Sequence, residues 1–308
     1  MNENLLMLAI SSLVSLPLSL ALAAAGLPLA SAVLLINPPK RVKVFRDKFG
    51  QQTATLCLMA GLAALLCLGG AAAFINIKYP AAASFWLSWP LPLAPLAGGA
   101  VLAAALAAVY RAVWHNMRDN RAAHASLGMA ATLAGWLACY LCVTFFRHFV
   151  VSSSEPAANP TFFLPPVNSV AWYIFPAALG LSLTFAGSLG SLYLIHRRDK
   201  DDFGRDYYNY SLKLACKWAF FSILPALVFL GGHFARLWPE VRNLPARQTF
   251  FWSEAAALAA FAMACLLWIL VIRNQNPLRL KLHCVAGYIL SLAGLAGVAL
   301  AYVSHYFG

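Results

Sequence analysis

The chain has 308 residues, of which 62% are hydrophobic and only 10% are charged. Soluble domains carry about 25% charged residues, so this composition excludes an ordinary soluble protein and indicates a polytopic membrane protein. The net charge of +12 would suit a nucleic-acid-binding protein, but the basic residues lie in loops beside apolar stretches, and we expect no nucleic-acid partner.

Eight apolar stretches follow one another along the chain, and each is long enough to cross a bilayer. A helix needs about 20 mostly apolar residues to span the hydrocarbon. The stretches cover 5–36, 51–76, 91–114, 125–146, 169–195, 214–232, 251–272 and 283–304. The first carries Glu3 and no basic residue ahead of it, so we expect a membrane span there and not a signal peptide. The sequence therefore predicts an all-α polytopic membrane protein with eight transmembrane helices.

The last four stretches resemble the first four. His124 opens the fourth stretch and His283 opens the eighth, and the residues that follow, HASLGMAATLAGWL and HCVAGYILSLAGLAG, are alike. The pattern predicts two tandem four-helix repeats, 1–160 and 161–308. Each repeat has an even number of spans, so the copies share one orientation and we expect an axis along the membrane normal to relate them.

Basic residues gather on one side of the predicted membrane. The connections after the odd-numbered spans carry 17 of the 22 Lys and Arg, and the other side carries Lys78, Arg147, Arg236, Arg242 and Arg247. Cytoplasmic loops are enriched in Lys and Arg. We therefore expect a multi-pass protein of the cell inner membrane with periplasmic N- and C-termini, whose basic loops contact membrane lipids.

Acidic residues avoid the centres of the predicted spans, and so do Lys and Arg. Ionisable residues inside the membrane usually mark ion pathways and proton relays. This distribution disfavours an ion-coupled pump, but it allows a carrier of neutral or lipid-like substrates.

Histidines form two groups at the ends of the spans. The outer group is His148, His233 and His305, and the inner group is His115, His124, His196 and His283. Imidazoles on facing helices of a bundle can hold a b-type haem between them. We expect His233 and His305 to be iron ligands in the second repeat, with His148 as a further haem-binding candidate. The alternative is that each histidine is an amphipathic residue at headgroup depth, and the sequence assigns no role to the inner group.

Two charged residues near the outer histidines complete the predicted site. Arg236 can pair with a haem propionate or a quinone headgroup, although the simpler interpretation, which we favour, is that it keeps the outer loop soluble. Glu254 is a candidate catalytic proton acceptor for quinol oxidation. A solvated acid near a helix N-terminus, stabilised by the helix dipole, is the simpler interpretation of Glu254, and we favour it.

Paired four-helix bundles with an outward N-terminus and outer-side histidines resemble the membrane subunits of cytochrome bd-type quinol oxidases and, more loosely, other b-type cytochrome subunits. The resemblance covers topology and no signature motif: the GRQPW sequence of the bd family does not occur in this chain. It implies haem b and quinone as cofactors and a redox subunit or cytochrome as the partner.

The sequence thus predicts a membrane b-type cytochrome-like subunit that passes electrons between quinone and a partner redox protein. Catalysis, if it takes place here, would be that of a quinol oxidoreductase subunit. Two other functions stay open: a small permease or lipid-handling carrier, and a cofactor-free membrane anchor.

Overall fold

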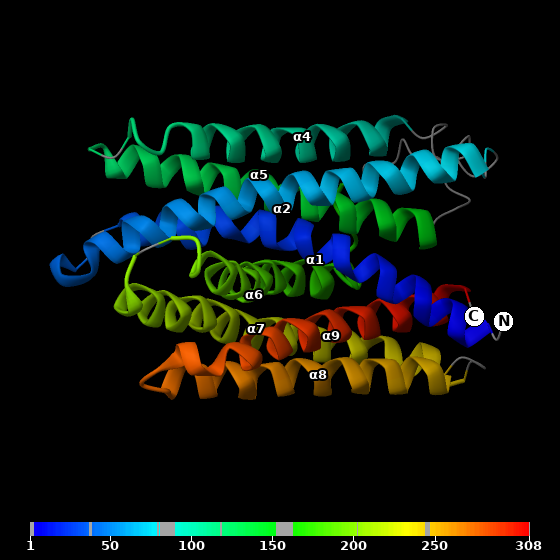
Figure 1. Cartoon of the computed structure of the whole chain (residues 1–308). Coiled ribbons are helices and arrows are strands. Elements are labelled where there is room, and N and C mark those ends of the chain that lie inside the picture. The colour runs from blue at the N-terminus through cyan, green and yellow to red at the C-terminus, as the bar shows by residue number, and fades with distance from the viewer. Residues whose placement is uncertain are drawn as a thin grey trace.

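The chain forms eight long helices that lie side by side. A computed structural model describes residues 3–36, 39–78, 80, 90–117, 119–151, 163–201, 203–243 and 247–307, and no β-strand occurs among them. The helices are α1 (Glu3–Leu35), α2 (Lys43–Lys78), α4 (Pro90–Ala112), α5 (Arg121–Val151), α6 (Ala171–Arg197), α7 (Arg205–Val241), α8 (Arg247–Arg273) and α9 (Lys281–Phe307) (Figure 1). Short 3-10 turns at Lys40–Val42 and Pro277–Leu280 precede α2 and α9.

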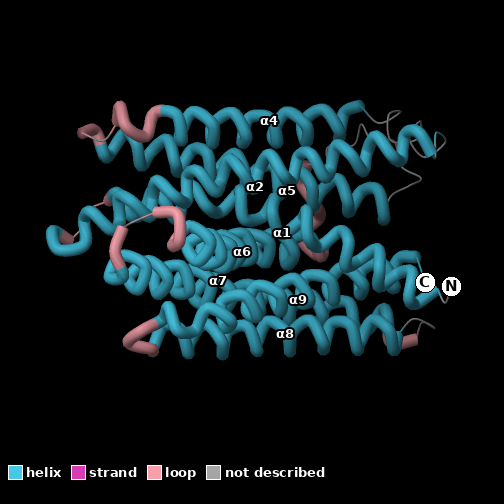
Figure 2. Tube along the Cα trace, in the orientation of Figure 1, coloured by secondary structure: helices cyan, strands magenta, loops and turns pink. Residues whose placement is uncertain are grey.

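All eight helices are long and apolar enough to cross a membrane. This confirms the predicted class, an all-α polytopic membrane protein. Most of the described loops lie at the two ends of the helices, and one loop segment lies further in, beside α1 and α5 in the view of Figure 2. Both termini lie at one of these ends, which we call the terminal end (Figure 1). The other end, with the α1–α2, α4–α5, α6–α7 and α8–α9 connections, is called the basic end.

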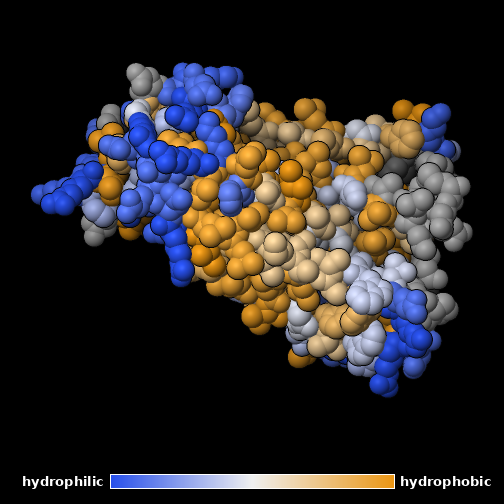
Figure 3. All heavy atoms as spheres, turned by 60° about the horizontal axis from the view of Figure 1, so that its bottom comes forward, coloured by the Kyte–Doolittle hydropathy of each residue, from blue (hydrophilic) through white to orange (hydrophobic). Residues whose placement is uncertain are grey.

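The surface between the two ends is apolar. Large hydrophobic side chains such as Leu66 and Val228 are more than 70% exposed there. In the view of Figure 3, hydrophobic residues form a belt between hydrophilic ends. Such a belt would be unstable in water and matches the hydrocarbon layer of a bilayer.

Small residues allow the central helices to approach closely. A Cβ atom on Gly26 of α1 would lie 2.5 Å from the carbonyl oxygen of Ser182 in α6. A Cβ atom on Gly187 of α6 would lie 2.4 Å from the backbone nitrogen of Ala219 in α7. Helices in membranes associate through such close packing, because lipid tails compete with every apolar contact.

The helices of each half contact one another in the same order. In the first half α1 packs on α2 and α5, and α4 packs on α2 and α5. In the second half α6 packs on α7 and α9, and α8 packs on α7 and α9. The halves meet where α1 contacts α6 and α9 and where α5 contacts α6. The division into repeats 1–160 and 161–308 stays a prediction.

Candidate functional site at the terminal end

His233 lies in a fully buried position near the terminal end of α7. Gly232, the residue before it, faces the ring of Tyr173 in α6 so closely that a Cβ atom would lie 2.9 Å from that ring. The tight contact on the α6 side leaves the imidazole pointing towards α9, where Nε2 of His233 is 2.6 Å from the hydroxyl oxygen of Tyr302. The two rings also stack, with centroids 4.9 Å apart and an interplanar angle of 16°.

Glu254 of α8 is the third member of this cluster. Its side chain is 0% exposed, and its Oε1 lies 3.7 Å from Nδ1 of His233. This distance is too long for a good hydrogen bond but short enough for an ion pair. Neither carboxylate oxygen has a hydrogen-bond partner in the part of the chain that the structure describes. We call His233, Glu254 and Tyr302 the buried triad.

The favoured interpretation of Glu254 as a solvated acid is wrong. Helix α8 begins at Arg247, two turns before Glu254, so the carboxylate lies beyond the reach of the dipole at the helix end. Helices α8 and α9 also pack closely here, because a Cβ atom on Gly297 would lie 2.9 Å from the Ser253 carbonyl oxygen. The close packing excludes water from Glu254.

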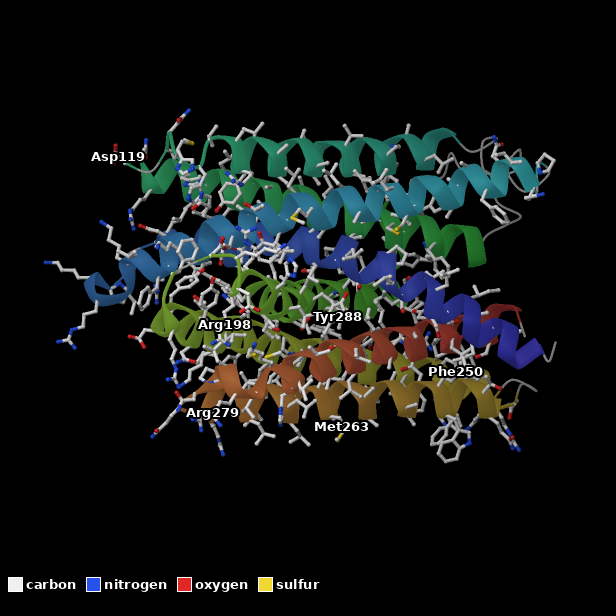
Figure 4. The ribbon with its side chains drawn as sticks, in the orientation of Figure 1. Asp119, Arg198, Phe250, Met263, Arg279 and Tyr288 are labelled. Carbon is white, nitrogen blue, oxygen red and sulfur yellow. The ribbon has the colours of Figure 1, made fainter. Side chains whose placement is uncertain are left out.

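The other predicted site residues lie around the triad. His305 is half-buried on α9, one turn beyond Tyr302, and its ring centroid is 6.0 Å from that of Phe250. Figure 4 shows Phe250 near the terminal end of α8. Arg236 is exposed and donates to Oε1 of Glu240 at 3.1 Å, so its charge is held by a neighbour on the same helix. His148 lies in α5, but its side chain is outside the described residues.

The packing of the triad does not fit haem ligation by His233. Nε2 of His233 pairs with Tyr302, and the phenol ring covers one face of the imidazole, so neither is open to iron in this arrangement. Among the described residues, no group of three or more His, Cys, Asp and Glu is arranged to hold a metal ion. A haem in this protein stays a prediction that an absorption spectrum tests.

Tyr302 is the member of the triad that the sequence did not single out. It lies three residues before His305, and residues three apart share a helix face. A search for polar residues one turn from His305 would have found it.

The inner histidines differ from one another as well: His124 is buried, whereas His115 and His196 are exposed and His283 is half-buried.

The triad can exchange protons. Tyrosine, imidazole and carboxylate are all proton donors or acceptors, and here they follow one another from a half-exposed phenol to a buried acid. An uncompensated charge on buried Glu254 would cost several kcal/mol, and the nearest basic group among the described residues is the imidazole of His233. No protein-family model and no curated protein matches the chain, and the case for its function therefore depends on this geometry.

Proposed function

We propose that this chain is the membrane subunit of a quinol-oxidising system and that the quinol headgroup binds at the terminal end beside the buried triad. The observation that carries the proposal is the position of His233 between buried Glu254, which faces its Nδ1, and Tyr302, which pairs with its Nε2. Ionisable residues placed inside a membrane protein are expensive and usually functional. Glu254 is the one carboxylate that is fully buried among the described residues.

Quinol oxidation requires proton acceptors as well as an electron acceptor. Each quinol releases two electrons and two protons, and a positioned base must lie within hydrogen-bond distance of the hydroxyl that loses its proton. Tyr302 is half-exposed and pairs with Nε2 of His233. The Tyr302 hydroxyl can donate its own proton to that nitrogen and accept the quinol proton in return, so the phenol stays protonated.

Glu254 stabilises the imidazolium that results. It faces Nδ1, the nitrogen that carries a proton when Nε2 accepts one. This is the arrangement in which a carboxylate orients a base and balances its new charge. The imidazolium returns its proton through the Tyr302 hydroxyl to the terminal end once the singly deprotonated quinol has moved away from that oxygen, and the second proton then follows the same path.

The electrons pass to a metal centre of a partner redox protein. The partner and the link to b-type cytochrome subunits of the bd kind remain part of the proposal. From the excess of basic residues at the opposite end, we place the terminal end on the periplasmic side of an inner membrane. Protons from quinol would then be released outside the cell.

Substitution of Glu254 tests the proposal. We expect Glu254→Gln, which keeps the shape of the side chain, to slow quinol oxidation in membranes that contain the native complex by about a hundredfold, the contribution typical of a proton-transfer group. Glu240→Gln is the matched control, since Glu240 is an exposed carboxylate on the same end. Equal rates in wild type and Glu254→Gln would contradict the proposal, and so would an equal loss in the control.

One observation favours the lipid-handling alternative. A lateral groove of about 630 Å³ lies between α1, α5, α6 and α7, and apolar side chains such as Trp136 and Phe221 form most of its wall. Arg46 and Lys217 line the groove as well. A carrier would move labelled lipid across vesicles made with the purified protein, and a quinol-oxidising subunit would not.

A further inference from the structure

A second polar site lies far from the triad, in a small cavity at the basic end of the first half. Its volume is about 200 Å³. The wall combines the end of α1, the first turns of α2, the segment after α4 and the first turn of α5. The residues that matter for its chemistry are Asp47, Lys48, Trp114, His115, Arg121 and His124.

Three buried polar atoms of the cavity wall have no hydrogen-bond partner among the described residues. They are Oδ1 of Asp47, Nη1 of Arg121 and Nε2 of His124. Asp47 and Arg121 form an ion pair through their other atoms, with Nη2 and Oδ2 2.8 Å apart. His124 as a whole is only 2% exposed. A buried polar atom without a partner costs about 1–3 kcal/mol, so three on one cavity indicate a polar molecule that binds there.

Aromatic packing holds His124 in position. Its ring centroid lies 4.5 Å from that of Trp114 and 4.8 Å from that of Tyr110. The Tyr110 hydroxyl donates to Oγ of Ser31 at 2.9 Å, and Ser31 donates to the Gly50 carbonyl oxygen, also at 2.9 Å. The imidazole cannot turn away without breaking this packing, so the aromatic neighbours fix the position of His124 beside the cavity.

The charges of the wall select the ligand. Arg121 and Lys48 are cations and Asp47 is an anion, so the cavity carries one excess positive charge when its histidines are neutral. The free Nη1 of Arg121 requires an acceptor, and a charged acceptor gives the stronger hydrogen bond. The free Oδ1 of Asp47 requires a donor on the same ligand. An anion alone would leave Oδ1 of Asp47 without a partner and would be repelled by its carboxylate.

We propose that this cavity binds a phosphate group that carries a hydrogen-bond donor next to it. The phosphate accepts from Arg121, and the adjacent donor pairs with Asp47. A second hydrogen of the ligand can be donated to Nε2 of His124, because the ring already makes a hydrogen bond with the Tyr110 backbone. Two sources share this chemistry: a phospholipid headgroup with an ammonium or hydroxyl group, and free hydrogen phosphate. The volume corresponds to about seven water molecules at roughly 30 Å³ each, which is enough for either group.

The cavity lies where lipid headgroups are found. Asp47 is four residues after the start of α2, and Arg121 is the first residue of α5, so both are at the edge of the apolar belt. Lys48 already lies over the Phe203 ring, 3.9 Å from its centroid, and its charge is held beside the cavity. Basic clusters at this depth attract anionic headgroups.

Native mass spectrometry of the delipidated, purified protein tests the proposal. The probes are phosphatidylethanolamine, phosphatidylglycerol, phosphatidylcholine and inorganic phosphate. We expect the first two lipids to bind at least about tenfold more tightly than phosphatidylcholine, whose trimethylammonium group has no hydrogen to donate to Asp47. Binding of inorganic phosphate without preference among the lipids would assign the site to a soluble ligand. Equal, weak binding of all four probes would overturn the proposal and leave a water-filled cavity.

Variants connect the binding to these residues. Arg121→Gln should weaken binding of the preferred probe by about tenfold or more, because a charge-assisted hydrogen bond is lost. The double variant Asp47→Asn/Arg121→Gln removes both charges of the ion pair, so it leaves no unpaired charge. It replaces the single variant in the binding experiment if the single variant does not fold. Arg205→Gln is the control, since Arg205 is an exposed cation on the same end that pairs with Asn276. Wild-type binding by the double variant would also overturn the proposal.

Discussion

At the scale of single residues, the hydroxyl of Tyr302 decides how the triad works. Tyr302 is the one member of the triad that is only half-buried, and its hydroxyl pairs with an imidazole nitrogen of fully buried His233. Proton transfer to His233 therefore depends on this oxygen. A phenyl ring in the same position would keep the packing but could not transfer a proton, because hydrogens bound to carbon do not exchange.

Replacement of Tyr302 by Phe separates proton transfer from packing. We expect Tyr302→Phe to slow quinol oxidation at least about tenfold and to lower the free energy of unfolding by about 1 kcal/mol, the worth of one hydrogen bond. Tyr288→Phe is the matched control. Its hydroxyl pairs with Ser19 at 3.2 Å in the protein interior, away from the triad. Figure 4 shows Tyr288 midway along the helices. The control should lose similar stability and keep the rate; a similar rate loss in both variants would contradict the assigned role.

The sequence predicted the residues of the site better than their contacts. It singled out His233 and Glu254, because both are polar residues at the ends of apolar stretches. It could not show that Tyr302 pairs with His233, because 69 residues separate the two along the chain. The sequence also suggested that Glu254 is exposed to solvent, whereas it is fully buried. Burial depends on the helix packed against it, and the hydropathy of α8 alone does not reveal that contact.

At the scale of helices, the apolar stretches located every span but not its ends. The stretch 214–232 lies within α7, which runs from Arg205 to Val241. The stretch 51–76 lies within α2, which begins at Lys43. Hydropathy marks the part of a helix inside the hydrocarbon. The backbone hydrogen bonds continue through polar turns into the headgroup region, where Lys and Arg side chains can reach water.

The contact between α6 and α7 tolerates no added volume at Gly187. Its Cβ atom would lie against the backbone of Ala215 and Ala219, which cannot rotate away. We expect Gly187→Ala to lower the free energy of unfolding by about 1–3 kcal/mol, the usual effect of overpacking. Gly190→Ala on the same helix is the control, since nothing lies within 4 Å of that position. Thermal unfolding of both variants in detergent measures the difference, and equal melting temperatures would contradict the assigned contact.

At the scale of the whole molecule, sidedness is the property that determines which compartment each site faces. The buried triad is at the terminal end and the cavity around His124 is at the basic end. The distribution of Lys and Arg predicts that the basic end faces the cytoplasm. The triad would then exchange protons with the periplasm, and the cavity would bind its ligand from the cytoplasmic leaflet.

Labelling of single added cysteines tests this orientation. Val167 precedes α6 at the terminal end and is 96% exposed, and Lys200 is an exposed residue in the turn after α6. We expect a membrane-impermeant maleimide to label Val167→Cys in intact cells and Lys200→Cys only after permeabilisation. The unmodified protein, which has seven free cysteines of its own, gives the background. The opposite pattern would invert the orientation and move both sites to the other compartments.

The contacts of α1 with α9 have a consequence for biogenesis. The ribosome delivers α1 first and α9 last, yet Ser19 of α1 pairs with Tyr288 of α9, and Ser15 is buried on the same face of α1 one turn earlier. Until α9 has entered the bilayer, this serine-bearing face of α1 is turned towards lipid or towards the insertion machinery. The contacts of this face of α1 are complete only after α9 has been inserted, so we expect a chain that ends before α9 to leave these serines exposed to lipid.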